Sequence, residues 1–277
     1  MIEFTVQIVT YNDADRLLYV LNSLKDYKNV VVIDKSSTDN TKEVVESFNR
    51  PYYKIVYFDS QADKNGVEAI KKIQDKFPTE WVLDVTCSDI LHPALHDEML
   101  KYINENPEMK AVFIPLYRYS MGYVSKYSFY GDITYQRKLF KKSAYDFNID
   151  RLHEDCLANA NPSGYLKPSN KAVAFYHLTH ENLEMVMERH LRYARVEAET
   201  DMARMERSEY LYKSWRSVLR VVKNYLRLRT YKLGDKGKAQ LCMLLMYRCA
   251  NYLNLYFSKE EENNIKQTYD KIRRGEF

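Results

Sequence analysis

The chain has 277 residues, of which 45% are hydrophobic, and it contains only seven Gly and seven Pro. This composition supports a packed core, excludes bulk disorder and disfavours a loop-rich all-β fold. The net charge is only +4, but residues 189–238 hold 14 Lys and Arg against 6 Asp and Glu, so that stretch either attracts an anionic partner or is a solvated helical face with an excess of Arg.

Strand and helix patterns alternate through the first part of the chain. Short apolar runs predict strands at 5–10, 30–33, 54–58, 81–85 and 111–115, and helical spacing of apolar residues predicts helices at 15–24, 38–48, 66–77 and 93–103. This alternation is typical of βαβ units, so we predict an α/β fold with a mostly parallel sheet flanked by helices. Ligands of such sheets bind at the carboxyl ends of the strands.

The pattern becomes purely helical near residue 182. We expect helices from about 182 to 194, from 208 to 229 and from 239 to 256, with a turn at 232–237. The middle helix carries Trp215, Val218 and Val222 on one side, and we expect Trp215 to be a core residue. The predicted domains are therefore an α/β domain at 1–181 and a basic helical region at 182–277.

Two motifs lie at predicted strand ends. Val6-Gln7-Ile8-Val9-Thr10-Tyr11-Asn12 closes the first strand, and the second strand runs into Asp34-Lys35-Ser36-Ser37-Thr38-Asp39. An Asp at a strand end can accept hydrogen bonds from a base or ribose, and the following helix start offers free N–H groups. The order and separation of these motifs resemble the family 2 glycosyltransferases of the GT-A fold.

The resemblance implies a Rossmann-like domain that binds a nucleotide sugar, commonly UDP-linked. In that reading Tyr11 lies beside the base, Asp34 hydrogen-bonds it, and Lys64 lies near the nucleotide. The full set of expected nucleotide-sugar-binding residues is Thr10, Tyr11, Asn12, Asp34, Ser36, Lys64, Ser88 and Arg137.

Further signals resemble the lipopolysaccharide-core type of these enzymes. They are Gln136-Arg137-Lys138-Leu139-Phe140, His153-Glu154 and His177. The resemblance implies an inverting hexosyl- or pentosyltransferase, in which a carboxylate takes the proton of the acceptor hydroxyl. Glu154 is the expected base and Asp155 the alternative. Both could instead be loop carboxylates paired with Arg151.

One departure from the family concerns its Asp-x-Asp signature, which falls on Thr86-Cys87-Ser88 in this chain. Asp89 and His177 could still supply two ligands to a divalent cation such as manganese or magnesium. Alternatively, Arg137 and Lys138 could neutralise the diphosphate without a metal. The departure also leaves open a degenerate protein that binds nucleotide sugars without catalysis.

Two anionic acceptors fit the basic helix equally well. The first is a lipopolysaccharide-core-type glycolipid, and the second is a hydroxymethylated base in DNA, as in phage-type DNA hypermodification. In both cases the expected acceptor-binding residues are Arg216, Arg220, Lys223 and Arg227. The N-terminus lacks a secretory signal pattern and the four Cys lack zinc spacing. We therefore expect a cytoplasmic protein, either free, peripheral at the inner membrane surface or associated with DNA.

Overall fold

The computed structural model describes residues 2–48, 54–59, 67–147, 156–202 and 204–274. These residues form two compact units, Met1–Val124 with Gly131–Thr179, and Ser125–Tyr130 with His180–Phe277. The predicted domain boundary lies two residues later. No sequence pattern links Ser125–Tyr130 to the C-terminal helices, because the contacts between them join positions more than a hundred residues apart.

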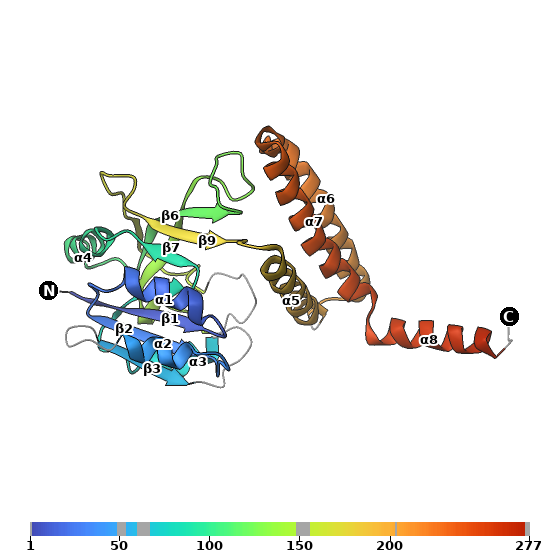
Figure 1. Ribbon diagram of the computed structural model, residues 1–277, viewed down its shortest axis with the longest axis horizontal. Coiled ribbons are helices and arrows are strands. Elements are labelled where there is room, and N and C mark those ends of the chain that lie inside the picture. Colours follow the sequence, from blue (N-terminus) through green and yellow to red (C-terminus); the bar gives the residue numbers. More distant parts are fainter. Residues whose placement is uncertain (1, 49–53, 60–66, 148–155, 203, 275–277) are drawn as a thin grey trace. The chain divides into compact units, whose positions relative to one another are not determined.

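The first unit is built on a nine-stranded sheet with the order β3-β2-β1-β4-β7-β6-β9-β5, to which β8 is added beside β6 (Figure 1). The strands are β1 (Phe4–Thr10), β2 (Asn29–Asp34), β3 (Lys54–Asp59), β4 (Trp81–Thr86), β5 (Asp89–Leu91), β6 (Ala111–Ser120), β7 (Ile133–Lys141), β8 (Ser163–Tyr165) and β9 (Phe175–Thr179). Five strand pairings are parallel and three are antiparallel. The predicted α/β fold with a mostly parallel sheet is confirmed.

The register of the parallel strands brings three strand ends together. Thr10 at the end of β1 pairs with Asp34 at the end of β2, and Val9 pairs with Thr86 at the end of β4. The residues that follow these strands therefore emerge at one edge of the sheet, where open α/β sheets bind their ligands.

Helices cover both faces of this sheet because alternate strand residues point to opposite sides. Val30 and Val32 face a core that includes side chains of α1, α2 and α4. Val31 and Ile33 face a second core that includes side chains of α3. The helices of this unit are α1 (Ala14–Ser23), α2 (Thr41–Ser47), α3 (Val67–Gln74), α4 (Leu95–Glu105) and the short 3₁₀ helix η1 (Lys142–Ala144).

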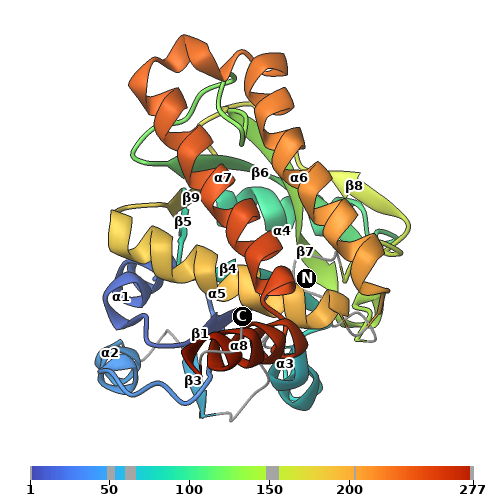
Figure 2. The ribbon, with the colours of Figure 1, turned by 90° about the vertical axis from the view of Figure 1, so that its right-hand side faces the viewer.

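The second unit is mainly helical. Its elements are α5 (Leu183–Met202), α6 (Arg207–Arg227), the 3₁₀ helix η2 (Thr230–Leu233), α7 (Asp235–Tyr256) and α8 (Lys259–Arg273). α6 and α7 lie side by side (Figure 2), joined by a buried hydrogen bond of 3.0 Å from Ser214 Oγ to Asn251 Oδ1. The C-terminal helical region is confirmed, although the predicted turn at 232–237 is shorter than expected because α7 begins at Asp235. None of the helices in the described part of the chain combines the length and hydrophobicity that a membrane crossing requires.

The expectation that Trp215 is a core residue is wrong. Its side chain is 51% exposed, whereas Val218 on the same helix is buried. The buried side of α6 consists of Tyr210, Ser214, Val218 and Val221. Of these four residues, the hydrophobic pattern singles out only Val218.

Candidate active site

The ends of β1 and β2 are tied together by their own loop residues. The Asn12 backbone N–H donates to Ser37 Oγ at 2.8 Å, and the Thr38 N–H donates to Asn12 Oδ1 at 2.7 Å. Asn12 and Ser36 both have positive φ, which non-glycine residues rarely adopt unless surrounding contacts impose it. The sheet edge therefore presents a fixed loop pair, beside which Tyr11 is half exposed.

Asp34 is buried under this loop and already has partners on both oxygens. Ser37 Oγ donates to Oδ1, while the Ser37 N–H at 2.9 Å and the Tyr57 hydroxyl at 2.8 Å donate to Oδ2. The largest effect on Tyr57 is burial, which together with the negative charge of Asp34 raises the pKa of Tyr57 well above its ordinary value. Tyr57 therefore stays a neutral donor that orients Asp34.

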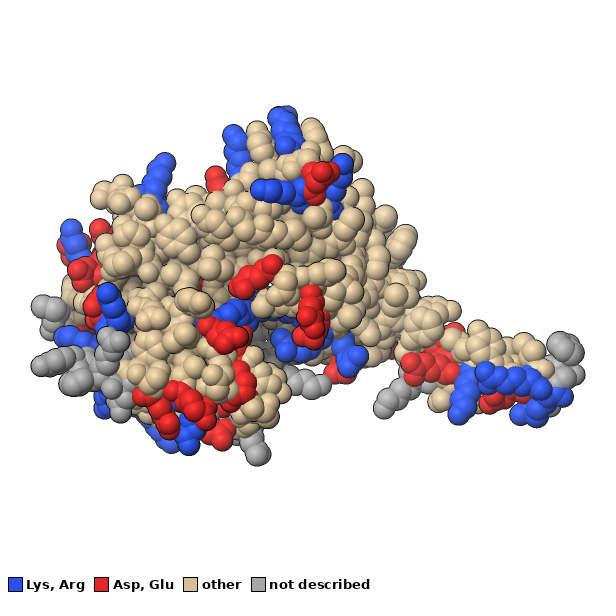
Figure 3. Space-filling view, in the orientation of Figure 1, with Lys and Arg blue, Asp and Glu red and all other residues tan. Residues whose placement is uncertain are grey.

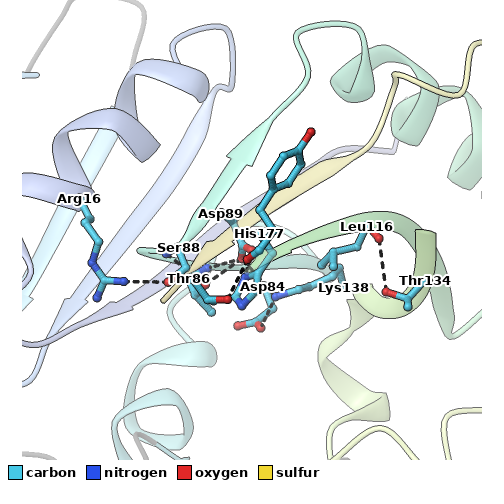
Figure 4. A network of polar contacts seen from close by, with 11 residues as sticks. Arg16, Asp84, Thr86, Ser88, Asp89, Leu116, Thr134, Lys138 and His177 are labelled. Atoms are coloured by element: carbon cyan, nitrogen blue, oxygen red, sulfur yellow. Dashed lines mark hydrogen bonds and ion pairs between the residues drawn. The ribbon is translucent and has the colours of Figure 1, made fainter. Parts of the chain in front are cut away.

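Ser88 lies where the family signature would place its second carboxylate, and it meets a cation instead. Arg16 of α1 donates from Nη1 to Ser88 Oγ at 2.8 Å (Figure 4). The Arg16 guanidinium is oriented by Asp13, which accepts from Nε at 2.6 Å and also from Nη2. Of the five N–H donors of an Arg, two remain for a ligand after these three bonds. The sequence analysis missed Arg16, because its contact to Ser88 joins positions 72 residues apart.

Cys87 stands between Thr86 and Ser88, the two hydroxyl residues that occupy the positions of the family's Asp residues, and its thiol has a structural role. Its Sγ lies 3.4 Å from Thr10 Oγ1 and so links the ends of β4 and β1. Burial raises the pKa of the Cys87 thiol to about 12, and the thiol therefore stays protonated and unreactive at neutral pH.

Asp89 is the centre of a buried polar network (Figure 4). Its Oδ1 accepts from His177 Nδ1 at 2.6 Å, and its Oδ2 accepts from Thr86 N at 2.8 Å and Thr86 Oγ1 at 3.0 Å. Lys138 Nζ lies 3.3 Å from the same Oδ2 and 3.6 Å from Asp84 Oδ2. The two residues expected at the metal, Asp89 and His177, are thus brought together as partners of each other.

A β-bulge brings Lys138 into this network. Val112 of β6 pairs with Leu139 of β7, but Phe113 pairs with Arg137, so Lys138 is the extra residue on β7. Bulges of this kind change the direction of a side chain and are common near active sites. The neighbouring Arg137 lies elsewhere, with its guanidinium 4.5 Å from the centre of the Phe113 ring.

The charges of the network stabilise one another. Burial by itself would raise the pKa of Asp89, but Lys138 and His177 more than offset it and hold the pKa well below its usual range. Burial likewise opposes the charge on Lys138, and Asp89 and Asp84 more than offset it, so the pKa of Lys138 is raised. Asp89 and Lys138 are therefore both ionised at neutral pH.

This donor set does not fit a divalent metal held by Asp89 and His177. Manganese and magnesium favour free carboxylate oxygens, but both oxygens of Asp89 are occupied and Lys138 already supplies the neighbouring positive charge. Over the described residues, no group of three or more His, Cys, Asp or Glu side chains could hold a metal ion. The metal role expected of these two residues therefore gains no support from the geometry.

Several expected residues lie outside the described ranges or belong to the second unit. The candidate bases Glu154 and Asp155, and the candidate nucleotide contact Lys64, fall in segments outside the described residues. Ser36 is described and donates from Oγ to Asp59 Oδ1 at 3.0 Å. The expected acceptor-binding residues Arg216, Arg220, Lys223 and Arg227 all lie on α6 in the second unit.

Comparison with known proteins identifies the family. The family model described as glycosyl transferase family 2 matches residues 5–156. Among solved structures, the mannosyltransferase PcManGT from Pyrobaculum calidifontis, in complex with GDP-Man and Mn2+, has a TM-score of 0.55 at 13% identity, over 92% of this chain and 87% of that chain. S. aureus TarS has a TM-score of 0.50 at 17% identity, over 71% of this chain but only 39% of its own. No curated protein sequence matches the chain.

The chain belongs to glycosyl transferase family 2, and it is a glycosyltransferase with a GT-A-like fold. The sheet edge that carries Tyr11, Asp34 and Ser88 lies within the matched residues. That edge is therefore the candidate donor site of a sugar-transfer enzyme.

Proposed function

We propose that the protein is an inverting glycosyltransferase that moves a sugar from a UDP-linked donor to a hydroxyl group of an anionic acceptor. One observation carries the proposal: the carboxyl ends of β1, β2 and β4 bring Tyr11, Asp34 and Ser88 with Arg16 to one edge of a family 2 sheet. The exposed ring of Tyr11 can stack on a base, and the carboxylate of Asp34 can accept a hydrogen bond from a ribose or from the edge of a base. The Arg16 cation can bind a diphosphate.

The proposed donor complex uses each group for one part of the nucleotide. Tyr11 stacks on the base, and Asp34, held by Ser37 and Tyr57, accepts a hydrogen bond from the base. Arg16 donates its two remaining N–H groups to the diphosphate, which replaces the expected role of Arg137 and Lys138. Lys138 is unsuited to that role because it is buried between Asp84 and Asp89.

The proposed reaction is a single displacement. Glu154, or Asp155 in its place, takes the proton of the acceptor hydroxyl while the hydroxyl oxygen attacks the anomeric carbon of the sugar. The bond from that carbon to the diphosphate oxygen breaks, and the electron pair leaves with UDP. Arg16 stabilises the negative charge that grows on the leaving diphosphate, an electrostatic effect that is stronger in the transition state than in the bound donor.

A panel of nucleotide sugars tests this function. We expect calorimetry to show that a UDP sugar binds. We also expect sugar transfer to be detected when a glycolipid or hydroxymethylated DNA is offered as acceptor. Binding without hydrolysis or transfer to any acceptor would support the degenerate, non-catalytic alternative. Binding of no nucleotide at all would reject the proposed donor site.

A further inference from the structure

A continuous apolar stripe runs along the outside of α6. Its members are large and exposed, and they follow one another at spacings of three and four residues, which keeps them on one face of a helix. Trp215, Leu219 and Leu226 are 51%, 52% and 60% exposed, and each lies apart from the core side of the helix. The stripe consists of Tyr212, Trp215, Leu219, Val222 and Leu226.

A row of cations borders this stripe on one side. Arg216, Arg220, Lys223 and Arg227 each follow a stripe residue directly in the sequence, so the row lies about 100° further around the helix. Arg216 contacts the stripe itself, with its guanidinium 5.6 Å from the centre of the Tyr212 ring. None of the four forms an ion pair with another described residue. Around its axis, α6 therefore presents first its core side, then the apolar stripe and then the cationic row.

The charge pattern decides what can cover the stripe. Between Tyr210 and Gly234 the sequence contains seven Lys and Arg and no Asp or Glu. A second copy of the chain that packed stripe against stripe would bring two cationic rows together without acidic partners, unlike helix pairs in which flanking charges are complementary. Figure 3 shows Lys and Arg side chains that outnumber the acidic ones at the end of the helical unit where α6 and α7 are joined. The partner of this face is therefore anionic.

The apolar stripe distinguishes between two candidate anionic partners, nucleic acid and a lipid bilayer. Nucleic acid would use the cationic row on its phosphates, but it offers no apolar layer for Leu219, Val222 and Leu226. An anionic lipid bilayer satisfies both features, because the stripe enters the boundary between headgroups and acyl chains while the row meets headgroup phosphates. Trp215 and Tyr212 suit this boundary, since their rings combine an apolar body with a polar group.

We propose that α6 is a membrane-docking helix that lies in the plane of an anionic lipid surface, with the stripe inserted and the row on the headgroups. The inference rests on the proposed function in one respect, because it takes the protein to transfer a sugar to an anionic acceptor. It adds that this acceptor is a lipid-linked molecule at the membrane surface. The stripe and the row run from Tyr212 to Arg227, which gives a docking face about 24 Å long.

Vesicle co-sedimentation of the full chain tests the docking surface. The probes are vesicles of phosphatidylcholine alone and of phosphatidylcholine mixed with phosphatidylglycerol. We expect binding to the mixed vesicles only, and we expect it to weaken as salt is raised. The variant Arg220→Gln with Arg227→Gln should lower binding roughly 30-fold, and the variant Leu219→Gln with Leu226→Gln should lower it at least as much. Matched controls are Lys28→Gln with Lys42→Gln, and Leu183→Gln with Leu191→Gln, which alter exposed residues elsewhere.

The outcomes separate the occupants of the stripe. Absence of wild-type binding to mixed vesicles, or equal losses in a control and its matched variant, would overturn the proposal. Binding to duplex or single-stranded DNA without vesicle binding would assign the row to nucleic acid. If the wild type self-associates and does not bind vesicles, and the Leu219→Gln with Leu226→Gln variant does not self-associate, the stripe is a contact surface for a second copy of the chain. Because the assay contains no nucleotide, its failure leaves the donor site intact, and failure of nucleotide binding leaves the vesicle result standing.

Discussion

Lys138 Nζ lies 3.3 Å from Asp89 Oδ2 in the interior of the first unit. This ammonium neutralises the carboxylate that the sequence analysis assigned to a metal, and it does so from the extra residue of a β-bulge. The side chain of Asp89 is fully buried, so the pair sits in a region of low dielectric where neither charge is stable alone. Each charge of the pair therefore depends on the other beside the candidate donor site.

Lys138→Met is expected to destabilise the protein strongly. Removing one partner of a buried ion pair leaves the other charge uncompensated and costs about 3–5 kcal/mol. The measurement is denaturant unfolding, with Lys110→Met as the control because Lys110 is exposed. A loss no larger than that of the control would show that Asp89 is compensated by His177 and Thr86 alone.

The same pair predicts the pH dependence of stability. The contribution of Asp89, whose pKa is lowered on folding, is present above about pH 3.9 and is lost as pH falls through the folded value. The contribution of Lys138, whose pKa is raised, is present below about pH 10.4 and is lost as pH rises through the folded value. In Lys138→Met the buried Asp89 carboxylate lacks this ammonium, so its pKa is higher in the variant than in the wild type. We therefore expect the difference in free energy of unfolding between the two proteins to shrink as pH falls, because protonation of Asp89 relieves the variant while it destabilises the wild type. A difference that stays the same from about pH 7 to about pH 4 would contradict this assignment.

Asp34→Asn is expected to weaken the binding of UDP by about 1–3 kcal/mol, the range for a lost hydrogen bond to a charged group. The control is Asp97→Asn, because Asp97 lies on α4 and its side chain is exposed. Calorimetry measures both affinities, and thermal unfolding shows whether the variants are folded. Equal affinity of wild type and folded Asp34→Asn would remove Asp34 from the donor site.

The four cysteines should differ in reactivity towards a thiol reagent. Cys242 is exposed and should react in the native protein, whereas Cys87 is buried with its pKa raised to about 12. Mass spectrometry of the labelled protein assigns the sites, and labelling after denaturation provides the control. Rapid native labelling of Cys87 would show that the β1–β4 edge opens readily.

The fold was largely predictable because it depends on local patterns. The parallel strands and the helices of the first unit follow from apolar periodicity, and Asp34 follows from a strand-end motif. The strands β7 and β9 were not predicted, since their residues mix polar and aromatic side chains without strict alternation. Arg16 with Ser88 depends on a contact between distant segments, and the direction of Lys138 depends on a bulge that no local pattern encodes.

The catalytic base is tested by two isosteric variants. Glu154→Gln should lower turnover by at least about 100-fold while donor affinity is unchanged, because only the proton acceptor is lost. Asp155→Asn is the matched control, and the measurements are steady-state transfer and calorimetric donor binding. If Asp155→Asn loses activity and Glu154→Gln keeps it, the base is Asp155. If both keep it, neither residue accepts the proton.

Arg16→Gln tests whether a protein cation holds the diphosphate. We expect UDP affinity of the wild type to be the same in excess chelator and in added manganese, because the Asp89 carboxylate is occupied and Arg16 supplies the positive charge. Arg16→Gln should weaken UDP binding about tenfold or more, a loss of roughly 1.5–3 kcal/mol, while uridine, which has no phosphate, should bind the wild type and the variant equally. Ser88→Ala should give a smaller loss, since Asp13 still orients the guanidinium. A large drop of wild-type affinity in chelator, with no effect of Arg16→Gln, would instead assign the diphosphate to a metal and restore the role expected of Asp89 and His177.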